Sequence, residues 1–302
     1  MNRHDFKERP SIDNVWGDFD FRVVMCGMGD DTAMLIAELY DRGLEPDELV
    51  FCDTGSEFPH TYRFIEYLQR WVNAKKWSKL VILKKVDKLD QPLSVISLCQ
   101  SQKTLPAVAF GSKSCSMRFK TETADKYFNN HKGCWNAWGV EKKGASNKTH
   151  TGKILRMVGI NRDEPNRVKS WSNQTKWTQI FPLFDWGIGD FESKAVEKVG
   201  LYYPRKSSCT ICPNMTHSEI NMLRVDYPEI YQQSLKIERD YQDNGLTKSS
   251  QSDLFGGESF DNTTLGLGGL NGKTWGQMMR EYDANPKRFK RMTDNKPCEC
   301  GH

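Results

Sequence analysis

Cysteines and one Cys-x-x-Cys turn carry the clearest chemistry in this chain. Cys209 and Cys212 form the pair in the segment Lys-Ser-Ser-Cys-Thr-Ile-Cys-Pro. Two thiols at this spacing on a turn can hold one metal ion with little strain. The remaining ligands must come from elsewhere, and the candidates are Cys115, Cys298 and Cys300. We therefore expect a cysteine-ligated metal site.

A second group of candidate residues lies in a turn near the start of the chain. The apolar run 21–25 leads into Cys-Gly-Met-Gly-Asp-Asp-Thr, and an apolar helix is expected directly after this turn. Glycines allow close backbone approach, and the free N–H groups at a helix start favour an anion. The turn fits neither the Walker pattern nor the dinucleotide-binding pattern. We expect it to bind the phosphates of a nucleotide through Cys26, Gly27, Gly29, Asp30, Asp31 and Thr32.

An acidic turn follows the next apolar run, 49–52, and reads Asp-Thr-Gly-Ser-Glu. Carboxylates at this place can accept hydrogen bonds from the ribose hydroxyls or the adenine amino group. Helix capping and turn formation ahead of Pro59 are an equally good interpretation. The candidate nucleotide contacts in this turn are Asp53, Thr54, Gly55 and Glu57.

Basic residues near these motifs are candidates for binding an anionic substrate. The planar fork of a guanidinium group suits phosphate and sulfate oxygens. The candidates are Arg118, Lys120, Arg162, Arg167 and Lys206. Salt bridges on the surface, with Asp163, Glu164 or Glu122 as partners, are the alternative interpretation.

Alternating strands and helices must position these groups. We expect strands at 21–25, 49–52, 80–86 and 154–160, and helices at 32–40, 59–72, 190–199, 228–241 and 275–282. This alternation predicts an α/β fold of Rossmann-like type, with a parallel sheet and helices on both faces. Carboxyl ends of neighbouring parallel strands meet at one edge of the sheet, which is where such folds bind nucleotides.

Composition suggests how the chain is organised and where it acts. A chain of 302 residues with 37% apolar content can bury one sizeable core. Nine cysteines without a signal-peptide core favour thiols or metal ligation over disulfides, and we expect a cytoplasmic protein. The sequence has no apolar run of 18 residues, so no membrane association is expected. The formal charge of +4 is mild.

Three segments are predicted along the chain. Residues 1–20 read as a polar arm, and residues 21–245 as the nucleotide-binding domain. Residues 246–302 combine a linker rich in Gly, Ser and Asn with an irregular, cysteine-containing C-terminal extension.

The order of these motifs resembles the phosphoadenosine phosphosulfate (PAPS) reductase family of the adenine nucleotide alpha hydrolase, or PP-loop, superfamily. The likeness is nearest to phage and bacterial members and covers about residues 20–240. Residues 26–32 lie over the loop Ser-Gly-Gly-x-Asp-Ser, with Cys26, Met28 and Asp31 replacing serine, glycine and serine. A Gly-Ile-x-x-Asp-Glu strand end, a Pro-Leu-x-x-Trp segment and the Cys-x-x-Cys follow at 159–164, 182–186 and 209–212.

The resemblance implies an adenine nucleotide, ATP or PAPS, with Mg2+ as a candidate cation. It leaves two models of the metal site. In the first, Cys115, Cys209, Cys212 and a tail cysteine such as Cys298 hold a [4Fe-4S] cluster, which thiolates favour. In the second, Cys209, Cys212, Cys298 and Cys300 bind Zn2+ in a tetrahedral site.

The resemblance also implies a reaction, because Glu-Cys-Gly-His at 299–302 is similar to the C-terminal motif of sulfonucleotide reductases. A Cys300 thiolate would attack the sulfur of the bound sulfonucleotide and release the nucleotide monophosphate. A thioredoxin-like partner would then reduce the S-sulfonate left on the enzyme. A rival expectation is an ATP-dependent adenylating or thiolating enzyme that modifies tRNA or DNA. A third is a non-enzymatic nucleotide-binding module with a structural zinc.

Overall fold

The computed structural model describes residues 12–111, 114–140, 153–169, 176–243, 266–269 and 272–290. The chain divides into two compact units. The first unit comprises Met1–Cys52, His60–Leu83 and Ala124–Ser207, and the second comprises Asp53–Pro59, Lys84–Thr123 and Ser208–His302. These units do not coincide with the predicted segments 1–20, 21–245 and 246–302.

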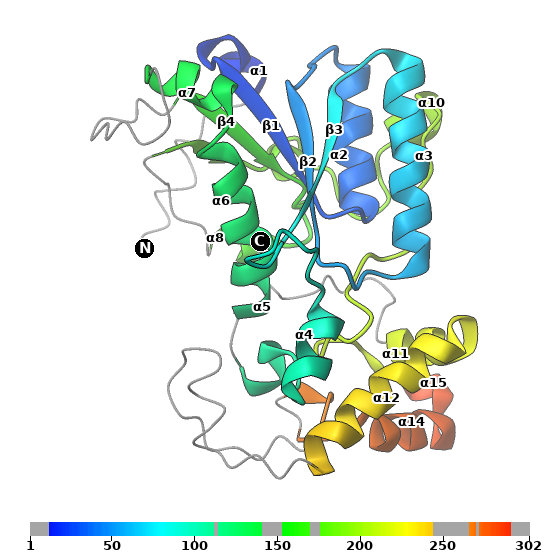
Figure 1. The fold of residues 1–302 in the computed structure, drawn as a ribbon. Helices are drawn as coiled ribbons and strands as arrows, with labels where there is room; N and C mark the ends of the chain where they lie inside the picture. The colour runs from blue at the N-terminus through cyan, green and yellow to red at the C-terminus, as the bar shows by residue number, and fades with distance from the viewer. Residues whose placement is uncertain are drawn as a thin grey trace. The chain divides into compact units, whose positions relative to one another are not determined.

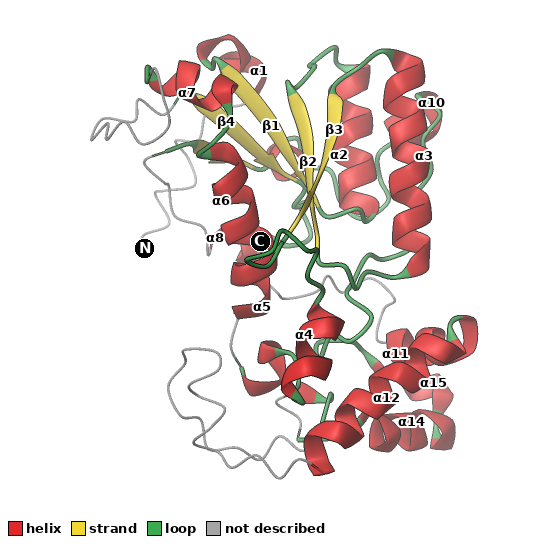
Figure 2. Ribbon diagram, in the orientation of Figure 1, coloured by secondary structure: helices red, strands yellow, loops and turns green. Residues whose placement is uncertain are grey.

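A parallel five-stranded sheet forms the framework of the α/β fold, as predicted (Figure 2). Its strands run in the order β3-β2-β1-β4-β5. Their bounds are β1 (Phe21–Cys26), β2 (Glu48–Asp53), β3 (Lys79–Lys84), β4 (Ile154–Val158) and β5 (Thr178–Ile180). Because β1 pairs with β2 on one side and with β4 on the other, the topology reverses between β1 and β4.

Helices cover both faces of this sheet (Figure 1). One face packs against α2 (Asp30–Asp41), α3 (Pro59–Lys75) and α10 (Ala195–Lys198). The other packs against α6 (Glu122–Phe128) and α7 (Lys132–Trp138). Successive strand residues alternate between the two cores, since Val24 and Phe51 lie in the first while Val23 and Cys52 lie in the second. Burial on both faces explains why these strands read as continuous apolar runs.

The second unit is mainly helical. Its longer helices are α4 (Val95–Gln102), α11 (His217–Asp226), α12 (Pro228–Asp243) and α14 (Trp275–Ala284). Trp275 is fully buried in their shared core. Glu238 of α12 accepts hydrogen bonds from the backbone N–H groups of Leu267 and Trp275, at 2.6 and 3.1 Å. The described part of the predicted C-terminal extension is therefore helical and packed, whereas Cys298 and Cys300 lie outside the described residues.

Shorter helical segments complete the fold: α1 (Ile12–Val15), η1 (Trp16–Asp18), η2 (Ala107–Phe110), α5 (Ser114–Ser116), η3 (Met117–Thr121), α8 (Pro165–Lys169), α9 (Pro182–Asp185) and α15 (Pro286–Lys290). The helix predicted at 190–199 is wrong over its first half, because α10 begins only at Ala195. Asp190 and Glu192 instead bond to the residues after β4, as described below. None of the described helices has the length and apolar character needed to cross a membrane.

Candidate functional site

The turn between β1 and α2 is closed by the hydroxyl group of Thr32. Its Oγ1 accepts hydrogen bonds from the backbone N–H groups of Gly27 and Met28, at 2.9 and 3.0 Å. Thr32 is only 4% exposed. The turn has thus used two of its own N–H groups internally, and these two are not available to a phosphate.

Met28 stands where the resembled loop has its second glycine. It adopts a left-handed backbone conformation with φ of 62°, and its side chain is fully buried in the core beside α2. Glycine adopts this conformation without steric cost, whereas other residues need support from their surroundings. Burial of the methionine side chain provides that support. Cys26 is likewise buried, at the end of β1, and burial raises its pKa.

The loop after β4 lies directly beside the start of α2. Met25 and Val158 are register partners at the carboxyl ends of β1 and β4. A Cβ added to Gly159 would lie 3.0 Å from the carbonyl oxygen of Asp31, so a side chain here would crowd the helix start. The strand order therefore brings the residues after β4 against the turn after β1, at the place where the topology reverses.

Three carboxylates meet at this place: Asp30 and Asp31 at the start of α2, and Asp190 from the loop before α10. One oxygen of each lies within 4.8 Å of the other two. Carboxylate oxygens grouped in this way are suitable ligands for Mg2+ or another hard divalent cation. The cluster contains no cationic residue, so without a cation its members repel one another.

Burial and this repulsion both raise the pKa values of Asp30 and Asp31. Desolvation and then the neighbouring Asp30 raise the pKa of Asp31, a hydrogen bond from Asn161 opposes them, and the net value is about 8. Burial also raises the pKa of Asp30, with Asp190 adding to the effect and Lys206 opposing it. A proton on Asp31 would therefore relieve the repulsion within the cluster, and a bound cation would do the same.

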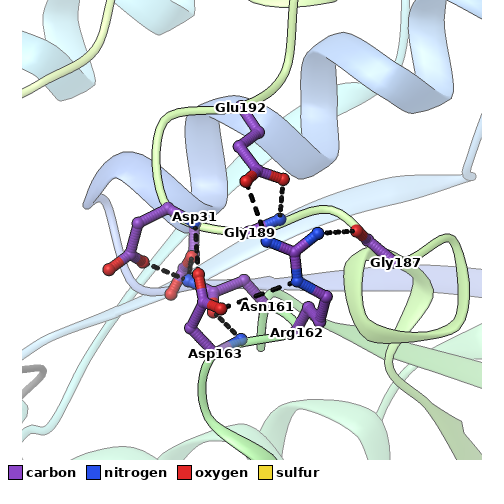
Figure 3. Close-up of polar contacts among 8 residues, drawn as sticks. Asp31, Asn161, Arg162, Asp163, Gly187, Gly189 and Glu192 are labelled. Carbon is purple, nitrogen blue, oxygen red and sulfur yellow. Dashed lines mark hydrogen bonds and ion pairs between the residues drawn. The ribbon is translucent and has the colours of Figure 1, made fainter.

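Polar contacts anchor the loop that carries Asp190 to the residues after β4 (Figure 3). Asn161 donates from Nδ2 to Oδ1 of Asp31 and to Oδ1 of Asp190, at 2.9 and 2.5 Å. Arg162 donates to the carbonyl oxygen of Gly187 and to Oε1 of Glu192, at 2.9 and 2.8 Å. These bonds connect segments that follow two different strands.

Two of the three arginines expected to bind an anion, Arg162 and Arg167, are engaged in ion pairs. Arg162 pairs with Glu192 and, at 3.6 Å, with Asp163. Arg167 pairs with Glu164. The salt-bridge interpretation given above therefore describes their contacts. The second carboxylate oxygen of Glu164, Oε1, is buried and accepts no hydrogen bond. Burial raises the pKa of Glu164, Arg167 opposes the rise, and the nearby Asp190 and Asp30 add to it.

The acidic turn after β2 belongs to the second unit and is satisfied by its own contacts. Asp53 accepts a hydrogen bond from the Gly55 N–H at 2.7 Å and pairs with Lys84 at 3.5 Å. Thr54 donates to Oε1 of Glu57 at 2.8 Å. Gly55 has φ of 67°, and a Cβ there would lie 2.7 Å from the Cβ of Ser94, so the turn requires glycine. Capping and turn formation are the roles visible in this structure.

Three of the predicted metal-ligating cysteines gather in the second unit. Cys115, Cys209 and Cys212 form no disulfide with a described cysteine. Beyond burial, Cys212 and Cys115 raise the pKa of Cys209, and Cys115 raises that of Cys212. Burial is the largest cause of the raised pKa of each thiol, and for Cys212 the value reaches about 11. The three sulfur atoms do not all lie within 4.8 Å of one another.

Backbone N–H groups point at these sulfur atoms. Ala107 donates to Sγ of Cys115 at 3.1 Å. Backbone hydrogen bonds from Ile211 and Asn214 lower the pKa of Cys209 and Cys212 against the effect of burial. Such donors stabilise thiolate ligands and cluster sulfurs. The donor set is therefore of the kind that suits a metal centre, although the three described sulfur atoms are not gathered closely enough to hold one metal ion.

The remaining basic candidates lie near carboxylates or thiols. Lys120 opposes the raised pKa of both Glu57 and Cys212, so its charge is close to both groups. Arg118 lowers the pKa of Cys115 against the effect of burial. The positive charge of Lys206 lowers the pKa of Asp30 against the effect of burial. The backbone carbonyl oxygen of Lys206 lies 2.9 Å from Nε2 of His60.

Sequence reasoning missed two residues at the centre of the carboxylate cluster, Asn161 and Asp190. Asn161 is 1% exposed and stands in the Gly-Ile-Asn-Arg-Asp-Glu segment, where only its neighbours were singled out. Asp190 was assigned to a helix. Its position in Gly-Ile-Gly-Asp, with two glycines close before it, was the signal for a loop.

Comparison with models of known protein families gives no match for this chain, and comparison with curated protein sequences gives none either.

Proposed function

We propose that this chain is an adenine-nucleotide-dependent enzyme that binds its nucleotide as a complex with a divalent cation. One observation carries the proposal: Asp30, Asp31 and Asp190 converge where the sheet topology reverses. Open parallel sheets bind ligands at this switch point. Mg2+ in nucleotide sites is held by one or two carboxylates together with phosphate oxygens and water.

The charges around the cluster support ATP with Mg2+ over PAPS as the ligand. Arg162 and Arg167 are neutralised by carboxylates, and Asp30 and Asp31 place negative charge where phosphate is expected. Phosphate oxygens approaching such a surface are repelled unless a cation intervenes. A nucleotide that brings its own divalent cation meets this requirement. The ATP-dependent adenylating or thiolating reaction, with tRNA or DNA as acceptor, follows as the favoured chemistry.

We assign the cysteines of the second unit to an iron-sulfur cluster, with Cys115, Cys209 and Cys212 as three ligands and Cys298 as the candidate fourth. In a tetrahedral zinc site, four sulfurs at 2.3 Å from the metal lie about 3.8 Å apart. The three described sulfurs are not all within 4.8 Å of one another, so they do not form such a tetrahedral set, whereas a cluster, in which each cysteine binds a different iron atom, does not require that spacing. When bound, such a cluster would supply redox or sulfur chemistry.

The sulfonucleotide reductase reaction is the second candidate, favoured by the Glu-Cys-Gly-His segment at 299–302. It needs Cys300 as nucleophile and a thioredoxin-like reductant. Sulfite release from PAPS by the wild-type chain, and its loss in Cys300→Ser, would support this reaction. Sulfite release that persists in Cys300→Ser would overturn it.

Calorimetric titration of the full, anaerobically purified chain tests the main proposal. We expect ATP to bind in the presence of Mg2+, to bind more weakly with EDTA, and to bind more weakly in Asp30→Asn. Asp240→Asn, a change at a surface ion pair of α12, serves as the matched control. Equal ATP affinity with and without Mg2+ would contradict the proposal. Binding without pyrophosphate release, with or without tRNA or DNA, would indicate a non-enzymatic nucleotide-binding module.

An absorbance spectrum with iron and zinc analysis tests the metal assignment. We expect a brown protein containing iron, and loss of the colour in Cys209→Ser. Cys134→Ser changes a buried cysteine of the first unit and should keep the colour. A colourless chain that contains zinc in place of iron would refute the cluster.

A further inference from the structure

Asn161 makes the contacts that hold the carboxylate cluster together. Its amide nitrogen carries two hydrogens, and it donates to Asp31 at 2.9 Å and to Asp190 at 2.5 Å. Its amide oxygen accepts the backbone N–H of Asp163 at 2.9 Å, which fixes the orientation of the amide. The side chain is 1% exposed, so water does not compete for these bonds. One buried amide thus joins two carboxylates that would otherwise repel each other.

The loop bearing Asp190 is fastened a second time through Arg162 (Figure 3). The Arg162 backbone N–H donates to the carbonyl oxygen of Ile188 at 2.9 Å, and its guanidinium group reaches Gly187 and Glu192. The backbone N–H of Asp190 donates to Oδ2 of Asp163 at 3.0 Å. These bonds hold the backbone of the loop, and the hydrogen bond from Asn161 orients the Asp190 carboxylate.

Space around this loop is correspondingly tight. A Cβ added to Gly189 would lie 2.5 Å from Oδ2 of Asp163 and 2.6 Å from Nη2 of Arg162. A side chain at position 189 would therefore push the ends of the Asp163 and Arg162 side chains out of their present positions. The position of the loop is set by the hydrogen bonds to Asn161, Arg162 and Asp163.

From these contacts we infer that Asn161, with Arg162 behind the same loop, is a positioning residue that sets the separation of Asp31 and Asp190 for a small divalent cation. This inference rests on the proposed cation site and extends it. The amide occupies one oxygen of each carboxylate, and the other oxygens are left for the metal and its water. A neutral donor is suited to this role, since a lysine or arginine would compete with the cation.

A purely structural role for Asn161 would give a different result. If the amide served only to close the loop, its removal would lower stability and leave the preference among cations unchanged. If it sets the ligand separation, its removal should weaken small cations most. Mg2+ and Mn2+ sites depend on strict geometry, whereas Ca2+ accepts variable coordination at 2.3–2.6 Å.

Titration of the full chain with Mn2+, followed by room-temperature EPR, tests the inference, and competition with Ca2+ gives the selectivity. We expect Asn161→Ala to weaken Mn2+ binding about 10- to 100-fold, the usual effect of removing a group that orients metal ligands. Binding of Ca2+ should weaken less, so the Mn2+/Ca2+ ratio should fall. Asn136→Ala, at an exposed position on α7, should match the wild type.

The outcomes separate this inference from the proposed function. No Mn2+ binding by the wild type would refute the cation site itself. Wild-type binding that is lost in Asp31→Asn but unchanged in Asn161→Ala would refute the positioning role alone. If Asn161→Ala fails to fold, Arg162→Met changes a half-exposed side chain of the same loop contact, and an unchanged Mn2+/Ca2+ ratio in that variant would overturn the inference.

Discussion

Cation binding at Asp31 should depend strongly on pH, because burial holds a proton on this carboxylate. With a pKa of about 8, Asp31 is about 1% ionised at pH 6 and half ionised at pH 8. A cation must displace the proton, so its affinity follows the ionised fraction. We expect Mn2+ to bind about 50-fold more tightly at pH 8 than at pH 6. An ordinary aspartate, with a pKa near 4, would give no change over this range.

The proton on Asp31 weakens cation binding, but it stabilises the folded state of the cation-free chain. The pKa of Asp31 is higher in the folded chain than in the unfolded chain, so the folded state binds more protons between about pH 4 and pH 8. The stabilising contribution is complete below pH 4 and is lost as the pH rises through 8. Without a cation, the free energy of unfolding should fall across this window, and added Mn2+ should restore it above pH 8.

Isothermal titration calorimetry with Mn2+ at pH 6, 7 and 8 measures this effect. Repeating the titration in buffers of different ionisation enthalpy counts the protons released. We expect close to one proton at pH 6 from Asp31, with a further contribution from Asp30. Asp31→Asn should bind weakly with a smaller dependence on pH, and Asp240→Asn should behave as the wild type. A wild-type affinity that stays constant from pH 6 to pH 8 would refute the reasoning.

Three substitutions test other contacts, each against a matched variant. Thr32→Val should lower the free energy of unfolding by about 1–3 kcal/mol for each N–H group left unpaired. Thr32→Ser keeps the hydroxyl group and should cost less. Equal losses of stability in urea denaturation would contradict the capping role. Gly189→Ala should displace the half-exposed side-chain ends of Asp163 and Arg162 and weaken Mn2+ binding, while costing less than the roughly 1–3 kcal/mol typical of overpacking in a core. Gly187→Ala meets no atom within 4 Å and tests the strain of its positive φ alone. Glu238→Leu leaves the N–H groups of Leu267 and Trp275 without their acceptor and should lower the free energy of unfolding by about 1–3 kcal/mol for each group. Glu238→Gln keeps an acceptor oxygen and should recover most of the loss. Equal stability of the two variants would show that these hydrogen bonds contribute little.

Much of the fold could be predicted from local patterns. Apolar runs at 21–25, 49–52 and 154–160 correspond to β1, β2 and β4 because strands buried on both faces are continuously apolar. The helix at 59–72 has a face of apolar residues at helical spacing and was confirmed as α3. These signals are short in range, and each element carries its own.

The sequence alone also singled out the turn after β1, since Gly27, Gly29, Asp30 and Thr32 follow a strand and begin a helix. Its composition predicted a ligand at the carboxyl edge of the sheet. The charge state of that edge, however, depends on side chains that arrive from other segments. Asp31 and Asn161 are 130 positions apart, and only the placement of β4 beside β1 brings them together.

The tertiary structure likewise determined which groups Arg162 and Arg167 contact. Arg162 and Arg167 read as anion-binding residues because a guanidinium group in isolation attracts phosphate. In the folded chain, Glu192 and Glu164 neutralise them. A sequence shows which charges a chain carries, whereas the strand order and the loops decide which of those charges meet, since electrostatic attraction acts over a few ångströms in space and not along the chain.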